Sequence, residues 1–323
     1  MNPAARARPF AAGTGDGHEP KGHPMGKRTN LVIVRAGDKS LHPGWLEEEG
    51  ERNWDLIVSY YGDDPAKFRD ADCERSDAKG MKWPALHDLL ASRPRLFTDY
   101  SYIWLPDDDL LTTKADVNRL FDICREYNLE LAQPSLTWSS YTSYLTTLRN
   151  AGLLLRYTNF VEVMAPVLSS ALLGRALASM GGTQTGWGLD YLWPRLATDK
   201  MTGVAIIDEV SVYHSRAVGG PLYAKMRSEG ASPWDELRSF FRDHGLPDEH
   251  RIETYGAVAP GGKALRHRSP RGLALRLAIG HLLAVRQTPY RGFALRKLRD
   301  FVAANLSRST SHPVEHVRPL AGF

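Results

Sequence analysis

The chain has 323 residues, 42% of them hydrophobic, with 41 Lys and Arg against 37 Asp and Glu, so it can bury a full core in one large domain with or without appendages. No apolar run approaches the roughly 20 residues that a membrane-spanning helix needs, and the N-terminal stretch lacks the apolar region of a secretory signal. Cys73 and Cys124 are the only cysteines, which excludes a disulfide framework or cysteine zinc site and favours the reducing cytoplasm.

Charge is distributed unevenly along the chain. From Lys263 onward there are twelve Lys and Arg residues against two acids, a net charge of +10, which leaves −6 for residues 1–262. A mildly acidic globule with a basic tail predicts either a tail that docks on an anionic surface, such as lipid, or a solvated helical appendage. We expect no nucleic-acid partner.

The first residues carry little structural signal. Residues 1–28 are rich in Gly, Pro, Ala and charge without periodicity, which predicts disorder, and Met25 is an alternative start. Residues 30–34 predict a strand that runs into a polar loop. In that loop Arg35 or Lys39 could contact a phosphate and Asp38 a ribose or base, with an ordinary loop between strand and helix as the alternative.

A second strand is predicted at residues 55–61, followed by a helix that opens around Pro84, because proline is tolerated in a first helical turn. Lys82, close to the start of this helix, could meet a diphosphate. The alternative is a solvated surface lysine.

The most informative stretch of the sequence is a predicted strand at residues 102–105, which is followed by Asp107, Asp108 and Asp109. Ligands bind at the carboxyl ends of strands in open α/β sheets. Asp107 and Asp109, one residue apart, could share a hard divalent cation that keeps open positions for substrate phosphates. The alternative is a turn before a helix that Thr113 caps.

Further elements follow with regular spacing. Residues 117–127 predict a helix with Cys124 on its core face, and residues 129–136 predict a strand. Residues 160–165 predict another strand with Glu162 in apolar company, where a carboxylate is either exposed at an edge or buried for a reason.

An irregular loop follows a helix predicted at residues 169–180. In it, glycines flank Trp187 and Asp190 comes next, at the start of a short or distorted helix because Pro194 removes a backbone donor. Asp190 is therefore a candidate for a site, with a helix cap as the alternative. Gly188 shares this loop.

The last part of the chain begins with a strand at residues 204–207. His214 beyond it could be a neutral imidazole ligand of a metal, with a hydrogen-bonded histidine as the alternative. A helix is predicted to start at Ser232. After a Gly/Pro linker at residues 255–269, two basic amphipathic stretches near 273–285 and 293–302 favour interfacial helices or helices packed on the domain.

Five segments occur in a specific order: the acidic strand end, Ala132-Gln-Pro134, the segment around Glu162, Trp187-Gly-Leu-Asp190, and the segment from Ile206 to His214. Together they resemble the DUF707 family, a group regarded as glycosyltransferase-like. The resemblance covers roughly residues 30–220. It implies a GT-A-type fold, with one mixed α/β sheet that has a nucleotide-sugar half and an acceptor half.

A more distant resemblance links Gly186-Trp-Gly-Leu-Asp190 and His214-Ser-Arg216 to β-1,4-galactosyltransferases. In that family the Asp-x-Asp motif and the later histidine bind manganese, and an acid after the glycine–tryptophan loop serves the acceptor. This sequence has a single acid, Asp190, where that family has several in a row. The base assignment by resemblance therefore stays open.

We expect an α/β, GT-A-like fold with a mixed, mostly parallel sheet flanked by helices. The expected parts are a disordered tail at 1–28, a transferase domain at 29–255, and a linker with basic helices at 256–323. The expected function is metal-dependent transfer of a sugar from a nucleotide-diphosphate donor to a hydroxyl of a glycan or lipid-linked acceptor, in the cytoplasm or at the membrane periphery. The alternatives are a non-catalytic nucleotide- or glycan-binding protein and a nucleotidyltransferase.

The expected site residues fall into four groups. The catalytic candidates are Asp190 and, in reserve, Glu162. The ligands of Mn²⁺ or Mg²⁺ would be Asp107, Asp109 and His214. The donor would contact Arg35, Asp38, Lys82, Asp107 and Asp108. The acceptor would contact Trp187 and Gly188.

Overall fold

The protein is described from a computed structural model, and the description covers residues 28–69, 73–217, 232–247, 250–265, 270–285, 288, 291–307 and 314–316. The predicted disordered tail therefore lies outside the described residues except for residue 28, and so does the alternative start at Met25.

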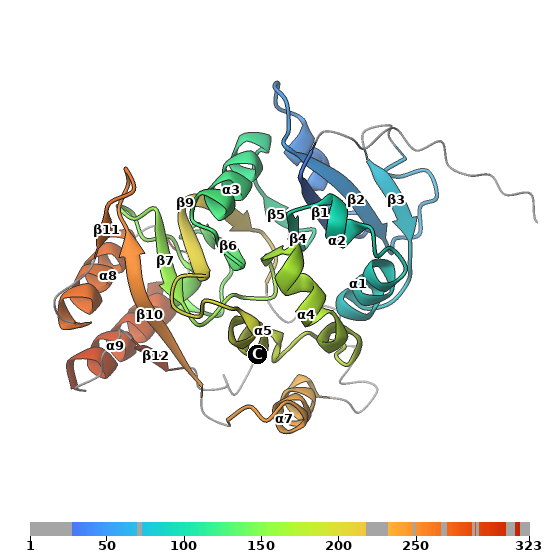
Figure 1. The fold of residues 1–323 in the computed structure, drawn as a ribbon. Helices are drawn as coiled ribbons and strands as arrows, with labels where there is room; N and C mark the ends of the chain where they lie inside the picture. Colours follow the sequence, from blue (N-terminus) through green and yellow to red (C-terminus); the bar gives the residue numbers. More distant parts are fainter. Residues whose placement is uncertain are drawn as a thin grey trace, which may run out of the picture.

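Twelve strands of the described residues form one sheet in the order β11-β10-β7-β9-β6-β8-β4-β1-β2-β3, with β12 beside β10 and β5 beside β9 (Figure 1). The strands are β1 (Asn30–Ala36), β2 (Trp54–Tyr60), β3 (Glu74–Asp77), β4 (Tyr102–Trp104), β5 (Leu110–Leu111), β6 (Leu131–Leu136), β7 (Leu155–Thr158), β8 (Val167–Ser169), β9 (Val204–His214), β10 (Arg251–Val258), β11 (Ala264–Leu265) and β12 (Val314–His316).

The sheet is more evenly mixed than the sequence suggested. Parallel pairing joins β3, β2, β1 and β4 in one block and β6 with β9 in another. Strand β8 runs antiparallel between these blocks, and β7, β10, β11, β12 and β5 also pair antiparallel. The prediction of a mixed α/β sheet flanked by helices is thus confirmed. The expectation that the sheet is mostly parallel holds only for the two parallel blocks.

Helices cover both faces of this sheet (Figure 1). They are α1 (Lys82–Ala91), α2 (Leu96–Asp99), α3 (Lys114–Glu126), α4 (Ser170–Gly181), α5 (Leu189–Leu196), α7 (Pro233–Asp243), α8 (Pro270–Ala284) and α9 (Arg291–Ser307), with short 3₁₀ turns η1 (His42–Leu46) and η2 (Leu145–Thr147). The predicted caps of α3 and α7 are confirmed, since their first turns donate to Thr113 and Ser232. Ser169 caps α4 in the same way, although no cap was predicted there.

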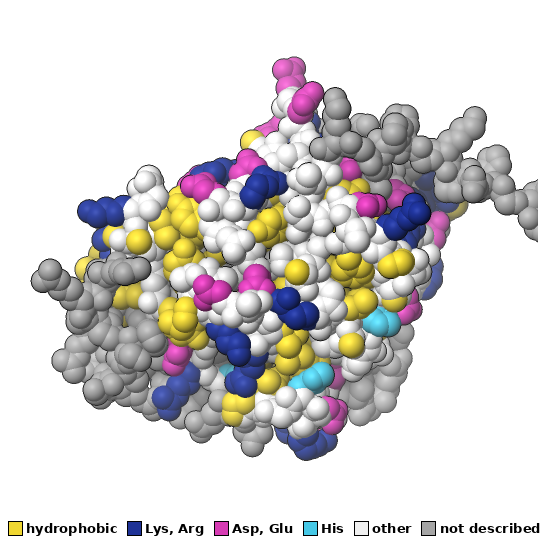
Figure 2. Space-filling view, in the orientation of Figure 1, with side chains coloured by type: hydrophobic (Ala, Val, Ile, Leu, Met, Phe, Trp, Pro, Cys, Tyr) yellow, Lys and Arg dark blue, Asp and Glu magenta, His cyan; other side chains and the backbone are white. Residues whose placement is uncertain are grey.

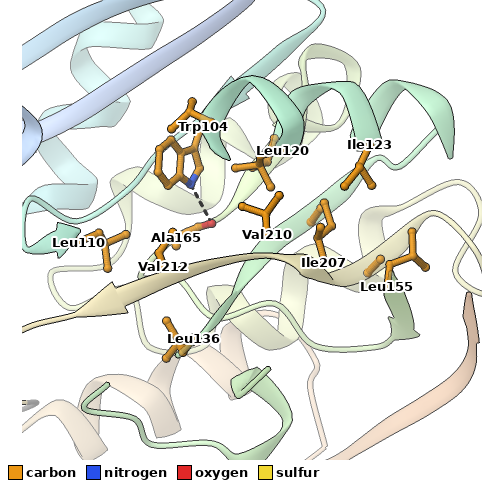
Figure 3. Close-up of a cluster of buried hydrophobic side chains, with 14 of the residues drawn as sticks. Trp104, Leu110, Leu120, Ile123, Leu136, Leu155, Ala165, Ile207, Val210 and Val212 are labelled. Atoms are coloured by element: carbon orange, nitrogen blue, oxygen red, sulfur yellow. Dashed lines mark hydrogen bonds between the residues drawn. The ribbon is translucent and has the colours of Figure 1, made fainter. Parts of the chain in front are cut away.

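Two apolar clusters form the core, one on each face of the sheet. Strand β1 supplies Val32 and Val34 to one cluster and Leu31 and Ile33 to the other, as expected of a strand buried on both faces. In the first cluster the Trp104 indole donates to the carbonyl of Ala165 at 3.1 Å (Figure 3). This bond fixes the segment before β8 against the end of β4.

Two expectations change. Residues 160–165 are not a strand but a turn-containing connection between β7 and β8, since their apolar side chains fill the core without ladder partners. The expected boundary between residues 255 and 256 falls inside β10, which pairs with β7 in the main sheet. The expected linker at 255–269 therefore includes parts of β10 and β11, while residues 266–269 lie outside the described residues.

Helices α8 and α9 lie beside β10 and β7, at the end of the sheet opposite β3 (Figure 1). Leu273 and Leu277 of α8 and Leu298 of α9 belong to the first core cluster. None of the helices that the structure describes has the length and apolar character to span a bilayer. Basic and acidic side chains are interspersed over the face shown in Figure 2.

Candidate active site

The segment that follows β4 meets the carboxyl end of β9 through β5. Arg35 and Asp107 continue the parallel pairing of β1 with β4 as an isolated bridge. Three residues later, at Leu110, strand β5 begins to pair antiparallel with β9, in a register that sets Leu110 opposite His214. This register brings the acidic strand end and the histidine, more than 100 residues apart in sequence, into contact.

Asp109 and His214 face each other. The Asp109 Oδ2 atom lies 3.3 Å from His214 Nε2, and both side chains are about nine-tenths buried. The other ring nitrogen, Nδ1, donates to the carbonyl of Tyr141 at 2.8 Å. Burial lowers the pKa of His214, but the Asp109 carboxylate and the Tyr141 carbonyl outweigh burial and raise that pKa to about 9.

Asp107 is paired with a lysine. The Lys82 ammonium, at the first residue of α1, lies 2.6 Å from Asp107 Oδ1 and also donates to the carbonyl of Val163 at 3.0 Å. The pair is partly open to solvent on the Asp107 side, whose side chain is 39% exposed. Lys82 and Asp107 thus lie together, as the donor-site prediction required, with the lysine charge balanced inside the protein.

Asp108 points inward and has a structural role. One carboxylate oxygen accepts from the Gly37 amide at 2.8 Å and the other lies 2.9 Å from the Arg216 guanidinium. Burial raises the pKa of Asp108, opposed by the Gly37 amide and by Arg216. Asp108 therefore joins the loop after β1 to the segment after β9, and contact with a donor would require it to leave these partners.

Arg35 and Asp38 are also engaged within the protein. Arg35 is buried, donates to the carbonyls of Ser59 and Gly80, and lies over the Tyr61 ring at 5.0 Å. Asp38 accepts from the Tyr60 hydroxyl and from the Asp63 amide. Direct contact of these two side chains with a nucleotide would require them to leave these partners.

Asp190 lies in the first turn of α5 and is buried. Its Oδ1 atom accepts from the Gly188 amide at 3.2 Å. Burial, and then the negative charge of Glu162, raise the pKa of Asp190 to about 8. Glu162 also contributes to the raised pKa of His214, after the larger effects of burial, Asp109 and Tyr141. The charge of Glu162 therefore acts on both candidate centres.

The two glycines that flank Trp187 are required by geometry. Gly186 and Gly188 have φ angles of +81° and +105°, and an added Cβ would lie 1.9 Å from Trp83 Nε1 and 2.3 Å from Phe240 Cδ1, respectively. Larger residues at either position would be strained and would clash. Gly188 therefore acts through backbone shape, and it is buried.

Glu236 in α7 anchors this loop, which was not predicted from the sequence. Its Oε1 atom accepts from the amides of Gln184 and Thr185 at 2.8 and 2.9 Å and from the hydroxyls of Thr183 and Thr185. Trp187 belongs to the same loop and is partly exposed. Its ring packs edge to face against that of Trp234 in α7, with the ring centroids 4.6 Å apart. The sequence predicted the start of α7 from its cap. It did not indicate that Glu236 contacts this loop, because about 50 residues separate the two segments.

Of the three predicted metal ligands, the structure brings two into direct contact. Within the described residues, no group of three or more His, Cys, Asp or Glu side chains has an arrangement that could hold a metal. Asp109 and His214 nevertheless form a donor pair of the right chemistry. A histidine whose Nδ1 donates to a carbonyl presents a lone pair on Nε2 when neutral, the orientation common among metal ligands.

Two cavities lie among the described residues, and Asp190 lines neither of them. One of about 180 Å³ flanks α5 and is lined by aromatic and basic side chains that include Phe160, Tyr191, Arg195 and His250. Another of about 390 Å³ opens where β2 and β3 end, with Tyr60 and Arg75 in its wall. Neither is lined by Asp109 or His214.

No family model matches the chain, and no curated protein sequence matches it either. The comparisons therefore do not support membership of the DUF707 family. Solved structures with a similar fold include S. aureus TarS 1-349 in complex with UDP (9% identity, TM-score 0.42, 68% of this chain and 67% of that one) and in complex with UDP-GlcNAc (11%, 0.44, 86% and 71%). A further S. aureus TarS structure covers 87% of this chain and 53% of its own, at 11% identity and a TM-score of 0.38.

Proposed function

We propose that the protein is a metal-dependent glycosyltransferase that moves a sugar from a nucleotide-diphosphate donor to a hydroxyl acceptor. The single observation that supports this most strongly is the approach of Asp109 and His214 to 3.3 Å at the end of β4. This acid and this imidazole were selected from the sequence as ligands of one divalent ion, and their contact depends on the β5–β9 register rather than on proximity in the chain.

The donor half would use Asp109 Oδ2 and His214 Nε2 to hold Mn²⁺ or Mg²⁺. A cation bound there would supply Lewis-acid stabilisation of the charge that builds on the departing diphosphate. Two protein ligands leave coordination positions for phosphate oxygens. The Lys82 ammonium, paired with Asp107, would add a second positive charge near the same diphosphate.

The acceptor half would use Asp190 as the base. Its carboxylate accepts the proton of the acceptor hydroxyl as that oxygen attacks the anomeric carbon and the bond to the diphosphate breaks. A pKa of about 8, set by burial and Glu162, is close to that expected of a group that takes up a proton near neutral pH. A single base opposite the leaving group favours inversion, and Trp187 would offer an aromatic face to the acceptor sugar.

The test is turnover of a panel of sugar nucleotides with Mn²⁺, measured for the protein and for Asp109→Ala. Removal of one metal ligand is expected to lower transfer or hydrolysis about 100-fold or more, and a control at the exposed Asp88, whose side chain is 82% exposed, is expected to keep wild-type turnover. Undiminished activity of Asp109→Ala would overturn the metal assignment.

The products separate the alternative functions. A glycosyltransferase releases a nucleoside diphosphate, whereas a nucleotidyltransferase releases pyrophosphate. Metal-dependent binding of a uridine or guanosine diphosphate without turnover of any donor would identify a non-catalytic nucleotide-binding protein.

A further inference from the structure

The outer face of the C-terminal helices is unusually apolar. Among the described residues, eight large hydrophobic side chains are exposed, and five of them lie on α8 and α9: Leu275, Ile279, Leu282, Leu283 and Leu295. Leu275, Ile279 and Leu283 on α8 recur at intervals of four residues and therefore form one stripe along the helix, with Leu282 three residues after Ile279 at its border. Leu283 is 76% exposed and Leu275 61% exposed. We call this stripe with Leu295 the outer leucine face.

The opposite side of α8 fixes its orientation. Leu277 is buried in the first core cluster, and its carbonyl accepts from the Asn150 side chain at 3.1 Å. Gly280 approaches Asn150 so closely that a Cβ there would lie 2.3 Å from Oδ1. His281 is buried beside Trp138, with ring centroids 5.6 Å apart. Because α8 is held this tightly, the outer leucine face points outward in the folded protein.

The same two helices also carry exposed basic side chains. Arg276, Arg291, Arg296 and Arg299 are exposed on the same two helices, in a C-terminal segment whose net charge from Lys263 onward is +10. Long basic side chains can bury their aliphatic stems near an apolar phase while the charged group stays in a polar layer. Exposed leucines and exposed arginines on the same two helices match the boundary between acyl chains and anionic headgroups.

We propose that the outer leucine face binds the surface of an anionic lipid bilayer. The charge selects this occupant over a second copy of the chain, because a face-to-face dimer would bring two segments of +10 together. An anionic headgroup layer instead neutralises the arginines while the leucines enter the acyl boundary. The helices would then lie in the plane of the interface and hold the globular part at the membrane without crossing it.

The test is co-sedimentation of the full chain with vesicles of phosphatidylcholine, with and without phosphatidylglycerol. Binding is expected to be at least about tenfold stronger with the anionic lipid, since each basic side chain near the surface adds attraction, and to weaken as salt is raised. Leu282→Gln combined with Leu283→Gln is expected to weaken binding about tenfold or more. Met201→Gln, which alters a hydrophobic side chain 48% exposed outside these helices, is the matched control and should bind as the wild type does.

Three results would overturn the proposal. They are equal or absent binding to the two kinds of vesicle, wild-type binding by the double leucine variant, and a dimer in light scattering that the double leucine variant dissociates. The last result would assign the face to a second copy. Thermal unfolding of each variant checks that it is folded. Because the outer leucine face contains no candidate active-site residue, the outcome is independent of the turnover test.

Discussion

At the scale of single residues, the pKa values of Asp190 and His214 are both raised, but for different physical reasons. Burial raises the pKa of Asp190 to about 8 because the charged carboxylate loses hydration and faces Glu162. The pKa of His214 rises to about 9 in spite of burial, because Asp109 and the Tyr141 carbonyl favour its charged form. A proton or a cation between Asp109 and His214 satisfies both side chains.

The shift at Asp190 has a consequence for stability. Its pKa is raised from 3.8 to about 8 on folding, so between these pH values the folded protein keeps a proton that the unfolded chain has released. The contribution of Asp190 to the free energy of unfolding therefore falls as pH rises through this window. Glu162, the Gly188 amide and the tyrosines Tyr144 and Tyr191 are the groups around it.

Asp190→Asn is expected to separate stability from activity. The amide cannot ionise, so at pH 8 the free energy of unfolding of the variant should exceed that of the wild type by about 1–3 kcal/mol. Transfer activity should fall about 10²–10⁴-fold because the base is missing. Urea unfolding at pH 5 and pH 8 and steady-state rates measure both. A variant as active as the wild type would show that another group takes the proton.

At the scale of elements, contacts between distant segments build the site. The cap of α3 could be predicted because Thr113 and Asp116 are three residues apart, and the Asp116 amide does donate to Thr113. The anchoring of residues 183–185 by Glu236 could not be predicted, because the partners are separated by about 50 residues. Residues 160–165 have the composition of a strand, and only the tertiary packing decides that they form a connection.

Glu236→Gln is expected to loosen the glycine–tryptophan loop. One carboxylate oxygen accepts from two amides and two hydroxyls, and loss of its charge weakens all of these bonds. We expect a loss of about 1–3 kcal/mol in the free energy of unfolding and faster hydrogen exchange at residues 184–185.

The matched control is Asp235→Asn on the same helix, where the side chain is 68% exposed and pairs with Arg238. This change should cost less than about 1 kcal/mol. Equal losses for the two variants would show that Glu236 acts only through the first turn of α7.

Strands β7 and β9 are joined by a buried ion pair. Asp208 and Arg156 have side chains 0% and 1% exposed, and the guanidinium donates two bonds to the carboxylate at 2.7 and 2.9 Å. Asp208→Asn would leave Arg156 buried without its counter-charge, which is expected to cost about 3–5 kcal/mol. Urea unfolding measures the loss.

The neighbouring Glu209 provides the comparison, because it also pairs with an arginine, Arg119, but both side chains are more than one third exposed. Glu209→Gln is expected to change the free energy of unfolding by less than about 1 kcal/mol. Similar losses at positions 208 and 209 would contradict the assignment of Asp208 as a buried structural charge.

At the scale of the whole molecule, the fold class and the candidate site differ in how far sequence alone could predict them. Strand and helix periodicity predicted most of the individual strands and helices, and the mixed α/β sheet was what the resemblance to a glycosyltransferase-like family implied. It could not fix strand direction, nor could it show that α8 and α9 share the core with the sheet, because both depend on pairing between distant segments. Asp109 and His214 converge as predicted, whereas Arg35, Asp38 and Asp108 are held by internal partners that the sequence did not indicate.

The central claim is that Asp109 and His214 hold a divalent cation that binds a nucleoside diphosphate. Titration calorimetry of UDP and GDP, with and without Mn²⁺, tests it most directly in the wild type, in Asp109→Asn and in the control Asp122→Asn, whose side chain is 47% exposed. We predict that Mn²⁺ strengthens binding of at least one of the two at least about tenfold in the wild type and in the control, but not in Asp109→Asn. Binding of neither nucleotide with Mn²⁺, or equal enhancement by Mn²⁺ in all three proteins, would contradict the account.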